Sequence, residues 1–102
     1  MVDVPENKRA AIAQACARFG VERLDVFGSA LSDDFRLGQS DLDLLVGFGA
    51  MHPYDLVDAY FGLLDELRDV LAVEVDLVMV DAVKNRFIAA DIERTKQILY
   101  AA

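Results

Sequence analysis

Two aspartates one residue apart, Asp41 and Asp43, stand at the start of an apolar segment. Side chains of a strand alternate between its two faces, so both carboxylates would point to one side and repel each other. A divalent cation removes that repulsion, and hard carboxylate oxygens suit Mg²⁺. The pair therefore predicts a magnesium site. Two solvated residues or a turn cap are the alternative, because aspartate is frequent enough here for such a pair to arise by chance.

Two further features lie where a phosphate-handling site needs them. Gly28 and Ser29 directly follow a predicted strand, where a missing Cβ lets backbone N–H groups approach an anion and the hydroxyl adds a donor. Asp76 lies in the middle of another predicted strand, "VEVDLVMV", facing away from Val75 and Leu77. A carboxylate in a buried strand is costly to desolvate, so a solvated turn does not explain it. A phosphate-holding turn, a paired metal site and a third carboxylate together predict phosphoryl transfer.

The segments that must position these residues alternate between helical and strand patterns. The predicted helices cover residues 5–19, 54–71 and 84–100, and the predicted strands cover 22–27, 41–48 and 73–80. A loop or short helix is expected between Gly28 and Gly38. We expect a small α/β (α+β) fold, a mixed β-sheet with helices packed on it, spanning residues 1–102 as one domain.

The apolar positions of these segments give the expected core. Leu24 and Val26 share one side of the first strand, and Leu42, Leu44 and Val46 share the side opposite the carboxylates. Apolar residues also follow the helices. Ile12, Cys16 and Phe19 share one face of the first, and Phe87, Ile88, Ile92 and Leu99 are core candidates on the last. On the second, Val57, Phe61, Leu64 and Leu71 form one stripe, which Leu56, Tyr60, Leu63 and Leu67 widen. The apolar surface of the second helix is wider than one packing face needs. It therefore either covers a partner or a second copy of the chain, or lies deeper in the core.

Composition and charge narrow the functional classes. The chain has 102 residues, a net charge of −8 and 55% hydrophobic residues. Such an acidic chain gains little from releasing counterions on a nucleic-acid backbone, so nucleic acid is not an expected partner. No apolar run approaches the roughly 18 residues that cross a bilayer, and the N-terminus lacks the order of a signal peptide. The single Cys16 fits a reducing compartment, and we expect a cytoplasmic protein.

Two other residues with reactive side chains, His52 and Cys16, are expected to have structural roles. His52, the only histidine, precedes Pro53 at a predicted helix start, where capping is the expected role. Cys16 lies on the apolar face of the first helix and is expected to be a small buried hydrophobic residue. Neither group is therefore a candidate for catalysis.

Three short segments together resemble a known signature. Gly28-Ser29 in "VFGS", Asp41-x-Asp43 in "SDLDLLV" and Asp76 in "VDLVMV" follow the order of the nucleotidyltransferase superfamily of the DNA polymerase β type. The chain resembles the minimal nucleotidyltransferases (MNT), commonly the antitoxins of HEPN/MNT toxin–antitoxin pairs, over nearly its whole length. The resemblance implies a nucleotidyltransferase-like fold in which Asp41 and Asp43 bridge two Mg²⁺ ions. It also implies that Asp76 holds the metal that activates the attacking hydroxyl and helps to take its proton, while Gly28 and Ser29 hold the β- and γ-phosphates.

The implied activity is magnesium-dependent transfer of a nucleoside monophosphate, AMP from ATP, to a side-chain hydroxyl of a HEPN toxin. Family members often carry basic residues just after Gly-Ser, whereas "ALSDD" follows here. Phosphate binding would then depend on backbone donors, on Mg²⁺, or on a distant cation such as Arg36 or Lys84. This departure keeps a second hypothesis open, a binding module that masks its toxin by contact. A third is a small-molecule modifier like the aminoglycoside nucleotidyltransferases, for which 102 residues leave no room for an acceptor domain.

Overall fold

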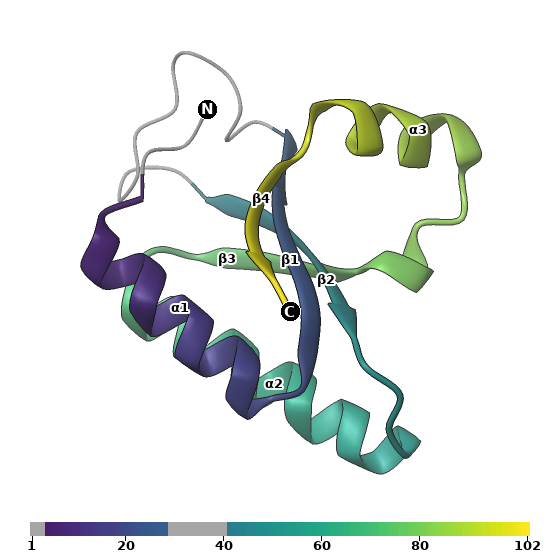
Figure 1. Ribbon diagram of the computed structural model, residues 1–102. Coiled ribbons are helices and arrows are strands. Elements are labelled where there is room, and N and C mark those ends of the chain that lie inside the picture. Colours follow the sequence, from purple (N-terminus) through teal and green to yellow (C-terminus); the bar gives the residue numbers. More distant parts are fainter. Residues whose placement is uncertain (1–3, 29–40) are drawn as a thin grey trace.

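The computed structural model describes residues 4–28 and 41–102 (Figure 1). Within these ranges the elements follow in the order α1 (Glu6–Arg18), β1 (Val21–Phe27), β2 (Leu42–Phe48), α2 (Pro53–Leu71), β3 (Val75–Met79), the 3-10 helix η2 (Val80–Ala82), α3 (Arg86–Thr95) and β4 (Gln97–Ala101). The loop or short helix expected before Gly38 lies outside the described residues, as do Ser29 and Arg36. No helix in the described ranges is long and apolar enough to cross a membrane.

The four strands form one mixed sheet in the order β3-β2-β1-β4. β1 runs antiparallel to both β2 and β4, whereas β2 and β3 are parallel. A parallel pair needs a long crossover connection, and α2 supplies it between β2 and β3. The predicted fold class, a mixed sheet with helices packed on it, is confirmed.

The main core lies between one face of the sheet and the helices α1 and α2, which run side by side (Figure 1). On the strands, the five predicted positions Leu24, Val26, Leu42, Leu44 and Val46 are all buried, as the alternation of side chains requires. The helices cover them with Ile12, Ala15 and Cys16 from α1 and with Leu63, Leu64, Leu67 and Leu71 from α2. This arrangement leaves the other residues of β2 and β3 pointing to the opposite face.

That opposite face is partly covered by α3. Leu45, which alternates with the core residues of β2, lines a cavity of about 60 Å³ together with Ala89 and Ile92 of α3. Leu45 and Ile92 are buried there, outside the main core. α3 therefore packs on the face away from α1 and α2, and Figure 1 shows it set apart from them.

The predicted helix over residues 84–100 is wrong after residue 95. α3 ends at Thr95, and β4 follows it to pair with β1. Of the predicted core positions, Ile92 is buried and Leu99 packs against the core, but Phe87 is 75% and Ile88 is 55% exposed. The hydrogen bonds that β4 makes to β1 outweigh the helical spacing of the sequence, because an unpaired edge of a sheet leaves backbone groups without partners.

α2 begins as predicted and leaves part of its wide apolar surface exposed. His52 is its N-cap, and the His52 Nδ1 accepts a hydrogen bond from the backbone N–H of Tyr54 at 3.2 Å, which confirms the capping role. Leu63, Leu64, Leu67 and Leu71 are buried as expected. Val57 and Phe61, which lie on the wide apolar surface expected either to cover a partner or to lie in the core, are 54% and 58% exposed. The helix therefore carries apolar side chains on its outer surface as well as on its inner one.

Candidate functional site

Asp43 and Asp76 lie beside each other on neighbouring strands. In the parallel pairing of β2 with β3, Asp43 is the register partner of Asp76. Each stands between buried residues that point to the main core, Leu42 and Leu44 in one strand and Val75 and Leu77 in the other. Both carboxylates therefore project from the face of the sheet opposite α1 and α2.

The electrostatics of Asp43 show how closely three carboxylates gather. Burial raises the pKa of Asp43, and the negative charges of Asp76 and then Asp41 raise it further. Asp41 is exposed and immediately precedes β2. In the described part of the chain, no basic side chain contributes to the pKa shift of Asp43. The ionised site is thus a concentration of negative charge that a cation would relieve.

Gly28 lies beside the site, directly after the neighbouring strand β1. Phe27, the last residue of β1, is the register partner of Asp43, so Gly28 follows directly beside that carboxylate. A Cβ at Gly28 would lie 2.7 Å from the Asp43 Oδ2, and its φ of +72° is in the region that favours glycine. The backbone here approaches the carboxylate more closely than a side chain would permit. The phosphate contact predicted for Ser29 lies outside the described residues.

Asp76 differs from its sequence-based interpretation in one respect. A buried strand was expected to make its carboxylate costly to desolvate, but the Asp76 side chain is exposed. β3 is an edge strand of the sheet, and its face around Asp76 is open to solvent. The desolvation argument for Asp76 is therefore wrong, although Asp76 is the register partner of Asp43.

The carboxylates of the site can supply part of the coordination shell of Mg²⁺. Across residues 4–28 and 41–102, no group of three or more histidine, cysteine, aspartate or glutamate side chains is placed to hold a metal ion. Mg²⁺ usually binds through one or two carboxylates, with water and substrate phosphates supplying the other oxygens, rather than through an all-protein cage. The adjacent carboxylates of Asp43 and Asp76, with Asp41 close enough to affect Asp43, provide that partial set.

A buried charge that the sequence analysis did not single out lies on the same face. Asp25, only 2% exposed, stands two residues before Phe27 in β1. Its Oδ1 is 3.1 Å from the Nε of Arg23, and its Oδ2 is 3.3 Å from the Nζ of Lys96. The signal was an aspartate between two predicted core residues, Leu24 and Val26. Lys84, one of the distant cations considered for phosphate binding, is exposed between η2 and α3.

The chain is similar to known proteins over most of its length. The family model described as "Nucleotidyltransferase domain" matches residues 9–99. A curated protein of Methanocaldococcus jannaschii, named "Putative protein adenylyltransferase MJ0128", is 36% identical over 78 residues, which is 74% of each chain. A solved structure described as a "putative minimal nucleotidyltransferase" has a TM-score of 0.72 and 32% identity, covering 89% of this chain and 88% of that one.

A more distant solved structure shares the fold. It is described as a tri-AMPylated Shewanella oneidensis HEPN toxin in complex with MNT antitoxin. Its matching chain has a TM-score of 0.61 and 16% identity, covering 95% of this chain and 72% of that one. At that identity the similarity is one of fold alone.

Proposed function

The chain belongs to the nucleotidyltransferase family, and from that premise we propose that it transfers AMP from ATP to a hydroxyl group of a protein partner. The name of the 36% identical relative supports a protein as acceptor. The fold shared with a chain solved beside an AMPylated HEPN toxin supports a HEPN-domain toxin as that protein, with this chain as its antitoxin. The nucleotide and the partner are both part of the proposal.

One observation carries the proposal: Asp43 and Asp76 are register partners, with the backbone of Gly28 against the Asp43 carboxylate. Nucleotidyl transfer needs carboxylates that hold cations against phosphates, and a turn in which the backbone can approach an anion. Both lie at one end of the sheet, on the face away from the main core. In our proposal Asp41 and Asp43 are shared metal ligands, Asp76 is the third, and Gly28 with Ser29 holds the phosphates.

In the proposed reaction, the acceptor hydroxyl oxygen attacks the α-phosphorus of ATP. A new oxygen–phosphorus bond forms, the bond to the β-phosphate breaks, and pyrophosphate leaves. Asp76, exposed at the edge of the sheet, is accessible to an incoming hydroxyl and would accept its proton. Mg²⁺ bound at these carboxylates would neutralise charge on the phosphates. The protein's own contribution is to hold the reacting groups in line.

A second candidate function is a module that masks its partner by contact. Its support is electrostatic, because the charges that affect Asp43 within the described ranges are all carboxylates, which repel a triphosphate. The exposure of Asp76 also removes the argument that only catalysis could justify a buried carboxylate there. Under this alternative the chain binds its partner without modifying it.

Transfer of labelled AMP separates the two functions. The purified chain, ATP labelled at the α-phosphate, Mg²⁺ and a HEPN-domain protein are incubated, and label on the protein is counted. We expect labelling by the wild type and loss of at least about a hundredfold in Asp43→Asn and in Asp76→Asn, since each removes a charge from the site. Glu6→Gln, which neutralises an exposed carboxylate at the start of α1, is the control and should label normally. Variants that bind and neutralise the HEPN protein as well as the wild type would establish masking instead.

A further inference from the structure

The outer surface of α2 carries a stripe of exposed apolar side chains. Tyr54, Val57 and Phe61 are 79%, 54% and 58% exposed. Their spacing of three and then four residues places them on one side of the helix. Leu63, Leu64, Leu67 and Leu71 of the same helix are already buried in the main core. Three large apolar side chains gathered on one solvent-facing stripe are typical of a surface that another molecule covers.

Acidic residues run alongside this stripe. Their spacing along α2 places them on the strip of surface next to the apolar stripe. These exposed residues, which we call the acidic strip, are Asp55, Asp58, Asp65 and Asp69. In the described residues of α2 the basic member is Arg68, whose Nη2 is 3.4 Å from the Oε2 of Glu74. The surface that borders the apolar stripe is therefore negatively charged.

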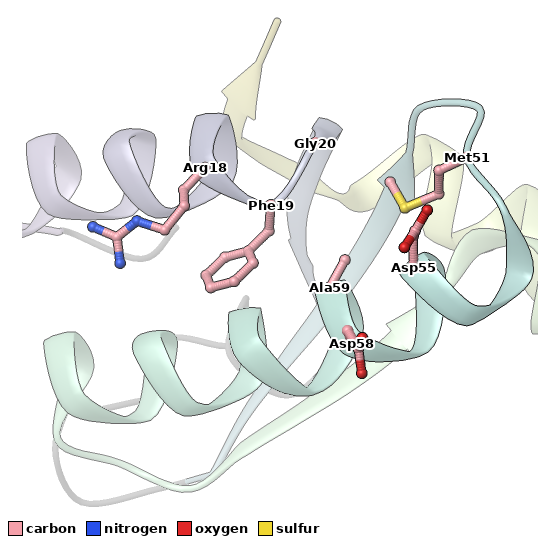
Figure 2. Close-up of a pocket in the computed structure, with 7 residues that line it drawn as sticks. All are labelled: Arg18, Phe19, Gly20, Met51, Asp55, Asp58 and Ala59. Carbon is pink, nitrogen blue, oxygen red and sulfur yellow. The ribbon is translucent and has the colours of Figure 1, made fainter.

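A hollow of about 380 Å³ adjoins the acidic strip, between the end of α1 and the start of α2 (Figure 2). Its apolar lining comes from Phe19, Met51 and Ala59, and Asp55 and Asp58 stand at its edge. Among the residues that line it, the basic one is Arg18, whose Nη1 is 2.8 Å from the Oε1 of Glu66. The hollow thus offers an apolar floor beside the carboxylates of Asp55 and Asp58, which suits the stem and charged head of a lysine or arginine.

We propose that this surface, formed by Tyr54, Val57 and Phe61 with the adjoining acidic strip, is a docking site for a protein segment. That segment presents apolar side chains bordered by lysine or arginine. Charge complementarity favours such a basic segment over a second copy of this chain. A second copy of this chain, with its net charge of −8, would bring two acidic strips into one interface. A basic partner replaces that repulsion with attraction.

The docking surface lies away from the carboxylate site. α2 covers one face of the sheet, and Asp43 and Asp76 project from the other. A segment held on α2 therefore leaves the site open, so binding and chemistry are separate properties. The inference rests on the proposed function only in taking the partner to be a protein.

Two synthetic helical peptides test the proposal. One has leucine on one face and lysine on the other, and its match has glutamate in place of lysine. Binding of each labelled peptide to the full chain is measured by fluorescence anisotropy at physiological ionic strength. We expect saturable binding of the lysine peptide, and binding at least about tenfold weaker for the glutamate peptide. Val57→Ser/Phe61→Ser should weaken binding of the lysine peptide by at least about tenfold, because central apolar contacts dominate such interfaces.

The matched control removes equally exposed apolar groups elsewhere. Phe87→Ser/Ile88→Ser on α3 leaves the charge unchanged and should bind the lysine peptide like the wild type. Asp58→Asn/Asp65→Asn should weaken binding without touching the apolar stripe. ATP-dependent thermal stabilisation should persist in all three variants, so a failed docking site is distinguishable from a failed nucleotide site. Equal binding by the wild type and Val57→Ser/Phe61→Ser would overturn the proposal. So would a wild-type dimer in sedimentation that this variant dissociates, because a second copy would then be the occupant.

Discussion

Replacing Asp43 by asparagine should stabilise the metal-free protein at neutral pH. Burial, Asp76 and Asp41 raise the pKa of Asp43 in the folded chain, so folding favours its protonated form. Stability from a group with a raised pKa is present below the unfolded pKa and is lost as pH rises through the folded pKa. At pH 7 the ionised Asp43 therefore makes the folded wild type less stable. Asparagine keeps the shape of the side chain without the charge.

The size of the effect follows from the strand register. Partners on neighbouring strands, such as Asp43 and Asp76, are about 5 Å apart. Two unit charges at that separation repel by about 0.8 kcal/mol in bulk water and by about 3 kcal/mol at an effective dielectric constant of 20. Asp76 is exposed and Asp43 is half-buried, so solvent screening keeps the repulsion near the lower limit. We expect a gain of about 1 kcal/mol, which raises Tm by about 5 °C in a chain of this size.

Thermal unfolding followed by circular dichroism in EDTA, from pH 3 to pH 8, measures this gain. The difference in Tm between Asp43→Asn and the wild type should shrink toward zero at about pH 3, because the raised pKa of Asp43 leaves its carboxyl mostly protonated there. Asp65→Asn, exposed in the middle of α2, should change Tm little at any pH. Mg²⁺ should stabilise the wild type and narrow the difference. A variant less stable than the wild type at pH 7 in EDTA would refute the reasoning, because favourable contacts of the carboxylate would then exceed the repulsion.

Three further predictions concern other parts of the fold. Gly28→Ala should cost about 1 to 2 kcal/mol in urea unfolding and remove ATP-dependent stabilisation, since its Cβ would lie 2.7 Å from the Asp43 Oδ2 at a φ of +72°. Lys96→Met should cost about 3 kcal/mol in the same assay, because it leaves the buried carboxylate of Asp25 with one fewer cation. Cys16, fully buried with its pKa raised to about 12, should not react with an aromatic disulfide reagent at pH 8 until the chain unfolds.

The alternation of side chains in β2 was sufficient to predict both faces of the sheet. Leu42 and Leu44 point into the core and Asp43 points away, because a period of two leaves no other arrangement once one face is buried. The pairing of Asp43 with Asp76 depends on which strands are neighbours, and spacing along the chain does not contain that information. Only the family signature brought the two together before the structure did.

The errors arose where tertiary contacts override local pattern. The segment after Thr95 has apolar residues that suit either a helix or a strand, and pairing with β1 decides for a strand. The burial of Val57 and Phe61 stayed open in the sequence, because periodicity does not say which part of a wide apolar surface meets the sheet. Asp76 lies in an apolar strand, yet exposure depends on what covers its face, and α3 covers Leu45 instead.

The buried pair of Asp25 and Lys96 bears on the order in which the sheet assembles. β1 has β2 as its near neighbour along the chain, whereas β4 comes from the far end of the sequence. Closing the longer loop costs more chain entropy, so the antiparallel pair of β1 and β2 should form first and β4 should join late. Until it does, one edge of β1 offers unpaired backbone groups to any passing strand. A slip of β4 by one residue would turn its side chains to the wrong face and leave the buried Asp25 with Arg23 as its cation, without Lys96. The ion pair between Asp25 and Lys96 therefore favours the native register of β4 over registers shifted by one residue.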